Sequence, residues 1–332
     1  MTHRQIGPFQ VAPIGLGCMN LSHAYGQPPA FPEAKALLER ALDLGVTLFD
    51  TAALYGFGAN ETLVGEVLAA HRDRFILASK CGMTGVDGKR VIDGRPTTLK
   101  ATCDAALKRL QTEVIDLYYL HRWAKQVPIE DSVGALAELV QAGKIRSIGL
   151  SEVSADTLRR AHAVHPIAAL QTEYSLWTRN PEIAVLDACR ELGTAFVAFS
   201  PVARGFLTDR VLDVANFDAK DIRRAMPRFT PGHYAANLKL LPEVRAVADE
   251  VGGTIAQVAL AWLLQRGEHI IPIPGTTSLA HLEDNMGALN LRLSAAQMQR
   301  LEAAVNARTV VGPRYNSVTQ TEIDTEEFNS PA

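Results

Sequence analysis

The stretch GVTLFDTAALYGFGANETLVG, residues 45–65, decides how the rest of the chain is interpreted. It begins with a short apolar run, residues 46–49, that has the length and composition of a buried strand. Asp50 ends this run, and Tyr55 follows five residues later in a glycine-bearing turn, before Asn60, which is expected to cap a helix. An acid and a phenol on a strand-to-helix loop are typical of α/β enzymes, although an acid capping the turn and a tyrosine covering the rim is an equal alternative.

The same alternation of a short apolar run with a helix continues along the whole chain. Eight such units predict a single (β/α)8 barrel, a TIM barrel, over residues 1–332. An open doubly wound sheet is the competing fold, but its G-x-G-x-x-G fingerprint is incomplete after Gly15-Leu-Gly17. The expected strands are residues 14–18, 46–49, 75–79, 115–120, 145–150, 167–170, 195–199 and 270–273.

Three further segments are expected outside the repeated units. Residues 4–12 are predicted to form an N-terminal β-hairpin that turns at Gly7-Pro8. Residues 122–128 and 203–233 lack helical or strand periodicity and are expected to be loops over the C-terminal mouth of the barrel. Residues 307–332 are expected to form a C-terminal tail.

Composition and charge exclude several classes of protein. The 332 residues are 47% apolar and 21% charged, with a net charge of −3, so neither nucleic acid nor a membrane is an expected partner. The four cysteines have no metal-like spacing, so reduced thiols in a cytoplasmic protein are expected, with no metal. The N-terminus lacks the apolar core of a signal peptide. The sequence carries no signal for an oligomeric state.

Polar, titratable residues occur where successive strands are expected to end. Lys80 follows the run at 75–79 and His121 follows the run at 115–120. Because the C-terminal ends of barrel strands converge on one mouth, these two are expected beside Asp50 and Tyr55. A buried structural ion pair of Asp50 with Lys80, and a core histidine, are the alternatives for the separate residues.

The chemistry of these four side chains predicts proton transfer to an oxygen. The pKa of a phenol, ordinarily about 10, falls beside an ammonium group, so Lys80 is expected to lower that of Tyr55. Asp50 would hold Lys80 charged, and His121 would donate a hydrogen bond to a substrate carbonyl. Protonation of an oxygen that becomes an alcohol also requires a hydride donor.

Several motifs resemble the aldo-keto reductases, and the resemblance covers nearly the whole chain. They are residues 45–56, Ser79-Lys80, residues 107–110 and 115–122, residues 171–175, and residues 273–277 with 282–285. The family's tetrad of Asp, Tyr, Lys and His falls on Asp50, Tyr55, Lys80 and His121. The resemblance implies an NADPH-dependent reductase of aldehydes and ketones that binds the dinucleotide in an extended form on the barrel.

The resemblance also implies the cofactor contacts. Ser151 and Gln171 correspond to contacts with the nicotinamide carboxamide, and Phe199 corresponds to the aromatic against the ring, with a core role as its alternative. Further positions correspond to contacts with the pyrophosphate, the 2′-phosphate region and adenine: Ser200, Val202, Gly205, Leu207, Gly275, Thr276, Thr277, His281, Asp284 and Asn285.

Two positions depart from the family pattern. Glu152 follows Ser151 where most relatives carry Asn, and an ionised carboxylate cannot donate to a carboxamide oxygen, so Glu152 is not assigned to the cofactor. Ser278 and His281 lie where many relatives carry an arginine for the 2′-phosphate. Loss of that bidentate partner weakens the preference for NADP, so NADPH is expected with some use of NADH.

A small carbonyl compound is the expected partner. An apolar, aromatic pocket suited to an aryl or alkyl arm is predicted from Met19, Tyr25, Phe57 and Trp123. Long arginine side chains usually extend into water, and this is the expectation for Arg204, Arg228 and Arg314. Binding of an anionic substrate is the alternative.

Two other functions remain as alternatives. One is a redox-sensing regulatory subunit that binds NADPH and turns over slowly, as the channel-associated β subunits that resemble this family do. The other is a Schiff-base lyase with Lys80 as the nucleophile, against which the neighbouring Asp50 argues.

Overall fold

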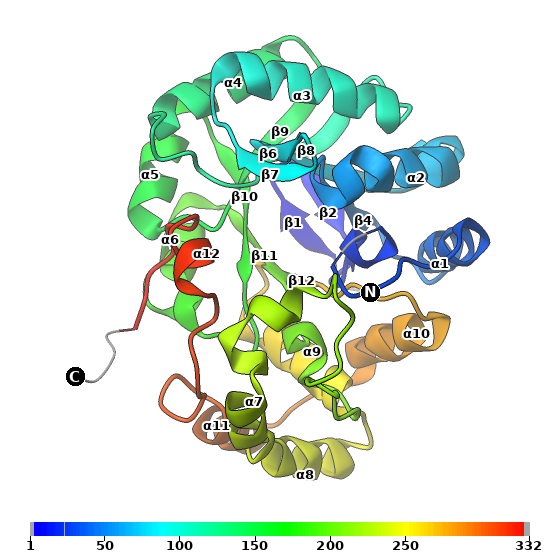
Figure 1. The fold of residues 1–332 in the computed structure, drawn as a ribbon, viewed down its shortest axis with the longest axis vertical. Coiled ribbons are helices and arrows are strands. Elements are labelled where there is room, and N and C mark those ends of the chain that lie inside the picture. Colours follow the sequence, from blue (N-terminus) through cyan, green and yellow to red (C-terminus); the bar gives the residue numbers. More distant parts are fainter. Residues whose placement is uncertain (1–2, 23, 329–332) are drawn as a thin grey trace.

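Eight parallel strands form the barrel in the computed structural model, which describes residues 3–22 and 24–328 (Figure 1). The two ends of the sheet meet, because Gly15 N–H donates to Pro272 O at 3.0 Å and Gly17 N–H to Pro274 O at 3.2 Å. The predicted barrel is therefore confirmed. In sheet order the strands are β12 (Ile270–Ile273), β11 (Ala195–Phe199), β10 (Ile167–Glu173), β9 (Ile145–Ser151), β8 (Ile115–Leu120), β5 (Ile76–Cys81), β4 (Leu48–Asp50) and β3 (Leu16–Gly17).

Helices surround these strands and connect each to the next (Figure 1). Their starts follow sequence signals: Pro32 and Pro96 lie in the first turns of two of them, and Thr254 accepts from Gln257 N–H to cap another. The helices are α1 (Phe31–Asp43), α2 (Ala59–Leu68), α3 (Pro96–Arg109), α4 (Ile129–Gln141), α5 (Ala155–Val164), α6 (Val185–Leu192), α7 (Pro231–Leu238), α8 (Leu241–Val251), α9 (Ile255–Arg266), α10 (Leu279–Gly287), α11 (Ala295–Ala304) and α12 (Ser317–Gln320).

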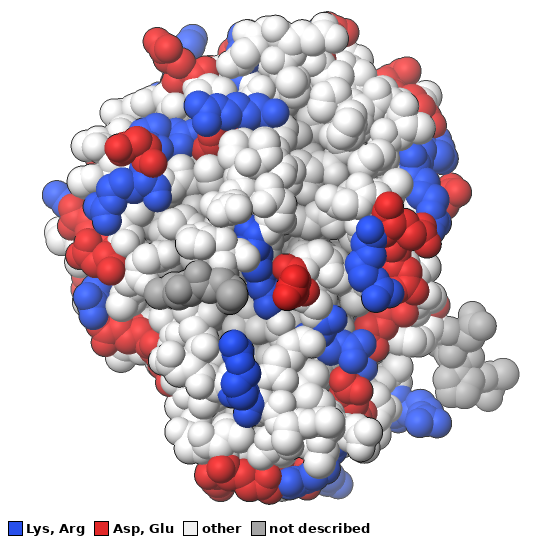
Figure 2. Space-filling model, turned by 180° about the vertical axis from the view of Figure 1, so that it is seen from behind, with Lys and Arg blue, Asp and Glu red and all other residues white. Residues whose placement is uncertain are grey.

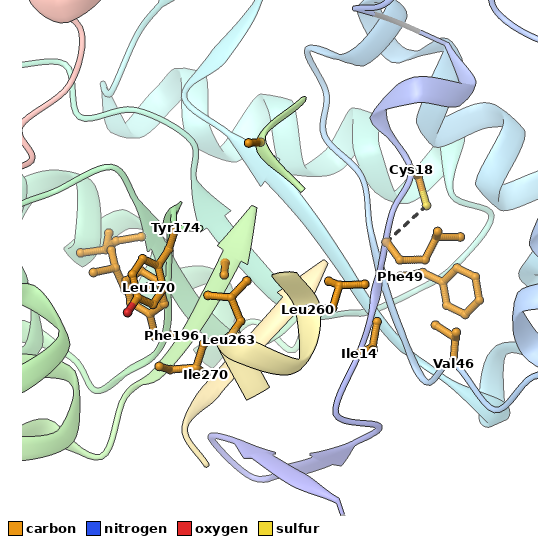
Figure 3. Close-up of a cluster of buried hydrophobic side chains, with 14 of the residues drawn as sticks. Ile14, Cys18, Val46, Phe49, Leu170, Tyr174, Phe196, Leu260, Leu263 and Ile270 are labelled. Atoms are coloured by element: carbon orange, nitrogen blue, oxygen red, sulfur yellow. Dashed lines mark hydrogen bonds between the residues drawn. The ribbon is translucent and has the colours of Figure 1, made fainter. Parts of the chain in front are cut away.

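Alternate residues of each strand belong to two different cores. One set, including Leu48, Ala78 and Val197, fills the barrel interior. The other set packs between strands and helices, and Figure 3 shows part of it, with Phe49 on β4 and Phe196 on β11. This alternation matters for the site, because a residue two positions after an interior residue also directs its side chain into the barrel.

The predicted N-terminal hairpin is confirmed as β1 (Arg4–Ile6) and β2 (Phe9–Val11), which pair in an antiparallel manner. It lies on the far side in Figure 1 and closes the N-terminal end of the barrel, where Ile6 and Val11 join the interior core. Arg4 fastens it by donating to Gly267 O at 2.9 Å and Leu264 O at 2.5 Å.

Segments between and after the units cover the opposite, C-terminal end. A second hairpin that the sequence pattern did not predict, β6 (Met83–Val86) with β7 (Lys89–Ile92), lies at this end, on the near side in Figure 1. Residues 203–233 form the expected long loop with only short 3-10 turns before α7. The described part of the tail, to residue 328, packs back on the barrel, since Arg314, Tyr315 and Ile323 are buried; residues 329–332 lie outside the described residues.

Charge on the outer surface is mixed. On the face shown in Figure 2, Lys and Arg side chains lie interspersed with Asp and Glu. Among the described residues, no single helix has both the length and the apolar composition to cross a membrane; α8 and α9 reach those two criteria only as a pair, bent by 85°. All four cysteines are buried as free thiols, and burial raises the pKa of Cys103 to about 12.

Candidate active site

The alternation of the strands explains why the predicted catalytic residues converge. Asp50 lies two residues beyond Leu48, and Lys80 lies two residues beyond Ala78, both of them interior residues. His121 follows β8 directly and lies two residues beyond Tyr119, which also fills the interior. All three side chains therefore point into the C-terminal end of the barrel, as the sequence predicts.

Lys80 is the centre of this group. Its side chain is fully buried, and its Nζ donates to the Asp50 carboxylate, to Thr51 O at 2.8 Å and to the Tyr55 hydroxyl at 3.4 Å. Gln171 Nε2 donates to the other Asp50 oxygen at 2.7 Å and fixes the carboxylate. Burial lowers the pKa of Lys80, but Asp50 and Tyr55 raise it more, so Lys80 remains protonated.

Tyr55 is presented by a strained turn. It begins a 3-10 turn, Tyr55–Gly58, in which Gly56, Phe57 and Gly58 all have positive φ angles, of 57°, 52° and 97°. A Cβ atom at Gly58 would also lie only 2.9 Å from Arg109 Cδ. The glycines therefore allow the chain to turn tightly behind the phenol, whose ring lies edge-on to that of His121 with 5.8 Å between centroids.

The pKa of Tyr55 differs from the sequence prediction. Burial raises it, Lys80 acts in the opposite direction, and the net pKa of the phenol lies above its ordinary value. Lys80 lowers this pKa, as the sequence predicts, but desolvation of the phenol exceeds the effect of one ammonium group, so the net pKa is raised and not lowered.

Two buried polar residues in the first turn of α2 support the loop, and the predicted capping role is wrong for one of them. Asn60 does not cap α2, which begins one residue earlier; it donates to Cys18 O at 2.8 Å and accepts from Thr51 Oγ1 at 2.6 Å. Glu61 accepts from Ser79 Oγ at 2.5 Å and also pairs with a guanidinium on α3. Because these contacts are made by tertiary neighbours, the local sequence could not indicate them.

A cavity of about 850 Å³ opens at this group of side chains. Asp50, Tyr55 and His121 lie on its wall, while Lys80 is buried behind them and does not line it. Within residues 3–22 and 24–328, no group of three or more His, Cys, Asp or Glu side chains is arranged to hold a metal ion. The predicted cofactor residues that line the cavity are Ser151, Gln171, Phe199, Ser200, Val202, Gly205, Gly275, Thr276, Thr277, His281, Asp284 and Asn285.

Sequence comparison agrees with this geometry. The model of the aldo/keto reductase family matches residues 13–306. The chain belongs to the aldo/keto reductase family. It is therefore an oxidoreductase enzyme, built on the barrel described above.

Individual relatives match along almost their full length. The chain is 42% identical to "Probable aldo-keto reductase 1" of Glycine max, covering 95% of this chain and 93% of the relative. It is also 42% identical to "Aldo-keto reductase yakc [NADP(+)]" of Schizosaccharomyces pombe, covering 94% of each. The solved structure of the glycerol dehydrogenase AKR11B4 of Gluconobacter oxydans superposes with a TM-score of 0.85 at 26% identity, covering 94% of this chain and 97% of that chain.

The substrate residues predicted for this aldo/keto reductase are only partly brought together. Met19 and Tyr25 line the cavity, but Phe57 and Trp123 do not. Phe57 is 54% exposed and packs on Gly85 of the β6–β7 hairpin, and Trp123 Nε1 donates to Val127 O at 2.8 Å. Leu207, predicted at the cofactor, is fully buried and is absent from the cavity wall, because its side chain packs in the hydrophobic core between the strands and the helices.

The three arginines expected to extend into water do not do so. Arg204 donates to Glu173 Oε2 at 2.7 Å and to the hydroxyls of Tyr25 and Tyr315 at 3.2 and 3.3 Å. Burial lowers the pKa of Arg204, but Glu173 and the two tyrosines raise it more, so that it lies well above the ordinary value. Arg228 donates to Trp177 O at 2.6 Å. These contacts replace water with carboxylate, phenol and carbonyl oxygens.

The third of these arginines explains the unusual Glu152. Arg314, in the tail, forms a buried two-point pair with Glu152, whose Oε1 also accepts from Glu173 N–H at 3.0 Å. Asp324 N–H donates to Glu152 O at 3.0 Å, so the tail is fastened to the end of β9. Glu152 is therefore a tail anchor in this family member.

Tail and loop residues on the cavity wall were missed by sequence reasoning. The positions of the loop and tail residues depend on contacts between segments far apart in the chain, so sequence periodicity could not predict them. For Arg122, the sequence showed only that it follows His121 at the end of a strand. The missed lining residues include Arg122, Met83, Tyr315, Asn316 and Thr319.

Proposed function

We propose that this protein reduces aldehydes and ketones to alcohols with NADPH as the reductant, and that Tyr55 supplies the proton. The observation that supports this most is the Tyr55 hydroxyl 3.4 Å from the ammonium of Lys80, beside His121 on the cavity wall. A phenol held next to a fixed cation is suited to protonate a carbonyl oxygen and to bear the resulting negative charge.

The residues of the cavity fit an extended dinucleotide. The wall includes Tyr55, Phe199, Thr276 and Asn285, which come from the loop after β4, from β11, and from the turn and helix after β12. At Gly275 a Cβ atom would lie 2.9 Å from Gly17 O, so the turn after β12 packs more closely on β3 than a side chain would allow. The turn before α10 presents backbone N–H groups suited to a phosphate.

Each part of the cofactor has candidate partners on the wall. Ser151 and Gln171 would hold the nicotinamide carboxamide, and Phe199 would lie against its ring. The loop at 200–205 would lie at the pyrophosphate, and Asp284 with Asn285 near the adenine. The relative from Schizosaccharomyces pombe carries NADP(+) in its name, which supports the assignment of this dinucleotide.

The tetrad would then divide the work of one reduction. NADPH held by these residues would supply the hydride that the carbonyl carbon requires. Tyr55 donates its proton to the carbonyl oxygen, and Lys80 stabilises the phenolate that remains. Asp50 keeps Lys80 charged, and His121 donates a hydrogen bond that orients the carbonyl.

A Schiff-base lyase is disfavoured by the same contacts. A nucleophilic lysine must lose its proton, but the carboxylate of Asp50 raises the pKa of Lys80 despite its burial. A slowly turning NADPH sensor is distinguished from a reductase by its multiple-turnover rate, which the following measurement also gives.

The preference between NADPH and NADH should be modest and should respond to one substitution. His281 is exposed, and Ser278 is committed to capping α10 by accepting from His281 N–H. We expect His281→Arg to lower the KM for NADPH roughly tenfold, about 1.4 kcal/mol, through a bidentate contact with the 2′-phosphate.

The assay follows absorbance of NADPH or NADH during reduction of 4-nitrobenzaldehyde and a panel of other carbonyls. The KM for NADH serves as the internal control and should change less than twofold in His281→Arg. Equal shifts for both cofactors would place His281 away from the 2′-phosphate, and turnover with neither cofactor on any carbonyl would contradict the proposed reductase.

The pH dependence of reduction follows from the raised pKa of Tyr55. Reduction requires the protonated phenol, and a pKa above the ordinary value of about 10 keeps that proton on at neutral pH. We therefore expect kcat/KM to be level from about pH 7 to 9 and to decline only above about pH 10. If kcat/KM instead declines as the pH rises through about 7, the proton donor is a group other than Tyr55.

A further inference from the structure

The cavity contains one half-buried arginine whose contacts differ from those of its neighbours. Arg204 pairs with Glu173 at 2.7 Å, Arg223 with Asp221 at 2.6 Å, and Arg90 with Glu322 at 2.5 Å. Arg122 lines the same cavity, but no carboxylate in residues 3–22 and 24–328 lies within 4.0 Å of its guanidinium nitrogens.

The hydrogen bonds of Arg122 use only neutral acceptors and only one of its nitrogens. Nη1 donates to His121 O at 2.7 Å and to Ser151 Oγ at 3.2 Å. These contacts hold the guanidinium between the end of β8 and the end of β9, beside the catalytic group. In the part of the chain that the structure describes, Nε and Nη2 donate to no protein acceptor.

The nearest acid along the neighbouring strand is engaged elsewhere. Glu152 directly follows Ser151, yet its carboxylate is taken by Arg314 and by Glu173 N–H. The strand end therefore offers Arg122 a hydroxyl and no compensating charge. A positive charge left in this state beside a partly apolar cavity wall favours binding of an anion more than a fully solvated arginine does.

Arg122 also acts electrostatically on the proposed reaction centre. Arg122 and Tyr55 line the same cavity, and Arg122 is among the charges that lower the pKa of Tyr55. Met19, Leu54 and Met83 line the cavity and supply apolar surface for the body of a small substrate. The wall thus combines a proton donor, an apolar contact surface and a half-buried cation, Arg122, without a counter-ion; Arg210, which also lines the cavity, is exposed to solvent.

We propose that Arg122 binds a carboxylate on the substrate, so that the preferred substrates are oxo acids: aldehydes or ketones that also carry a carboxylate group. A guanidinium is suited to this group, because two of its N–H donors match the two carboxylate oxygens. This inference rests on the proposed carbonyl reduction, and the test separates the two.

The test compares each carboxybenzaldehyde isomer (2-, 3- and 4-) with its methyl ester, using NADPH and measuring kcat/KM. In the wild type, at least one acid should exceed its ester by tenfold or more. Arg122→Met should lower kcat/KM for that acid by about 30-fold and for the ester by less than threefold. Benzoate should inhibit the wild type competitively against the aldehyde and should lose this effect at least tenfold in Arg122→Met.

Two control variants complete the design. Arg90→Met removes a cavity arginine that already has a partner, and the acid-to-ester ratio should change less than twofold. Arg122→Lys keeps the charge without the planar fork and should retain part of the preference. An equal loss for acid and ester in Arg122→Met, or an unchanged ratio, overturns the inference, while failure of the wild type to reduce even the esters contradicts the proposed reductase instead.

Discussion

Replacing Tyr55 with phenylalanine is expected to lower kcat for carbonyl reduction by about 10²–10⁴-fold, the usual contribution of a positioned general acid. The ring would keep its edge-on contact with His121, whose centroid lies 5.8 Å away, while the hydroxyl near Lys80 is lost. The measurement is the steady-state rate of NADPH oxidation with 4-nitrobenzaldehyde.

Binding and folding must be unaffected for this result to carry meaning. The dissociation constant of NADPH, from quenching of protein fluorescence, should change less than about twofold. Tyr118→Phe is the matched control, since it removes the hydroxyl of another buried tyrosine, whose side chain packs between strands and helices and does not line the cavity. If Tyr55→Phe and Tyr118→Phe reduce the aldehyde at the same rate, Tyr55 is not the proton donor.

Removing the guanidinium of Arg314 is expected to destabilise the protein by about 3–5 kcal/mol, because it leaves the carboxylate of Glu152 buried without a partner. Burial lowers the pKa of Arg314, yet Glu152 and the neighbouring groups raise it more, so Arg314 is charged in the folded state. Urea unfolding of Arg314→Met, followed by circular dichroism, measures the change in the free energy of unfolding.

A double variant distinguishes an unpaired charge from lost packing. Glu152→Gln with Arg314→Met keeps an acceptor for Glu173 N–H and removes both charges, so it should recover at least half of the loss. Arg159→Met removes one partner of an exposed ion pair with Glu191, and its free energy of unfolding should equal that of the wild type. A double variant that is less stable than either single variant would show that the charges themselves hold the tail.

The sequence predicted those parts of the site that strand periodicity controls. Asp50, Lys80 and His121 each lie at or next to the C-terminal end of a strand, and the C-terminal ends of all the barrel strands meet at one mouth. Loop side chains have no such constraint. Phe57 packs on Gly85 and Trp123 donates a hydrogen bond to Val127 O, although both were expected on the cavity wall.

Contacts across long distances in sequence were outside the reach of pattern reasoning. Arg314 and Glu152 are 162 residues apart, and nothing local to either indicates the other. The same applies to Arg204, whose buried partners lie on β10 and in the tail. The pKa of Tyr55 also depends on how completely the finished barrel excludes water, so one neighbouring charge was a poor basis for its direction.

The tail anchor has a consequence for biosynthesis. Glu152 emerges from the ribosome long before Arg314 does, so a barrel that closed early would bury a carboxylate whose partner had yet to be synthesised. Closure itself waits for Pro272 and Pro274, which bond to Gly15 and Gly17. Nascent chains halted shortly after residue 290 should therefore remain protease-sensitive at the end of β9, and synthesis of the remaining residues, up to residue 332, should complete the native state.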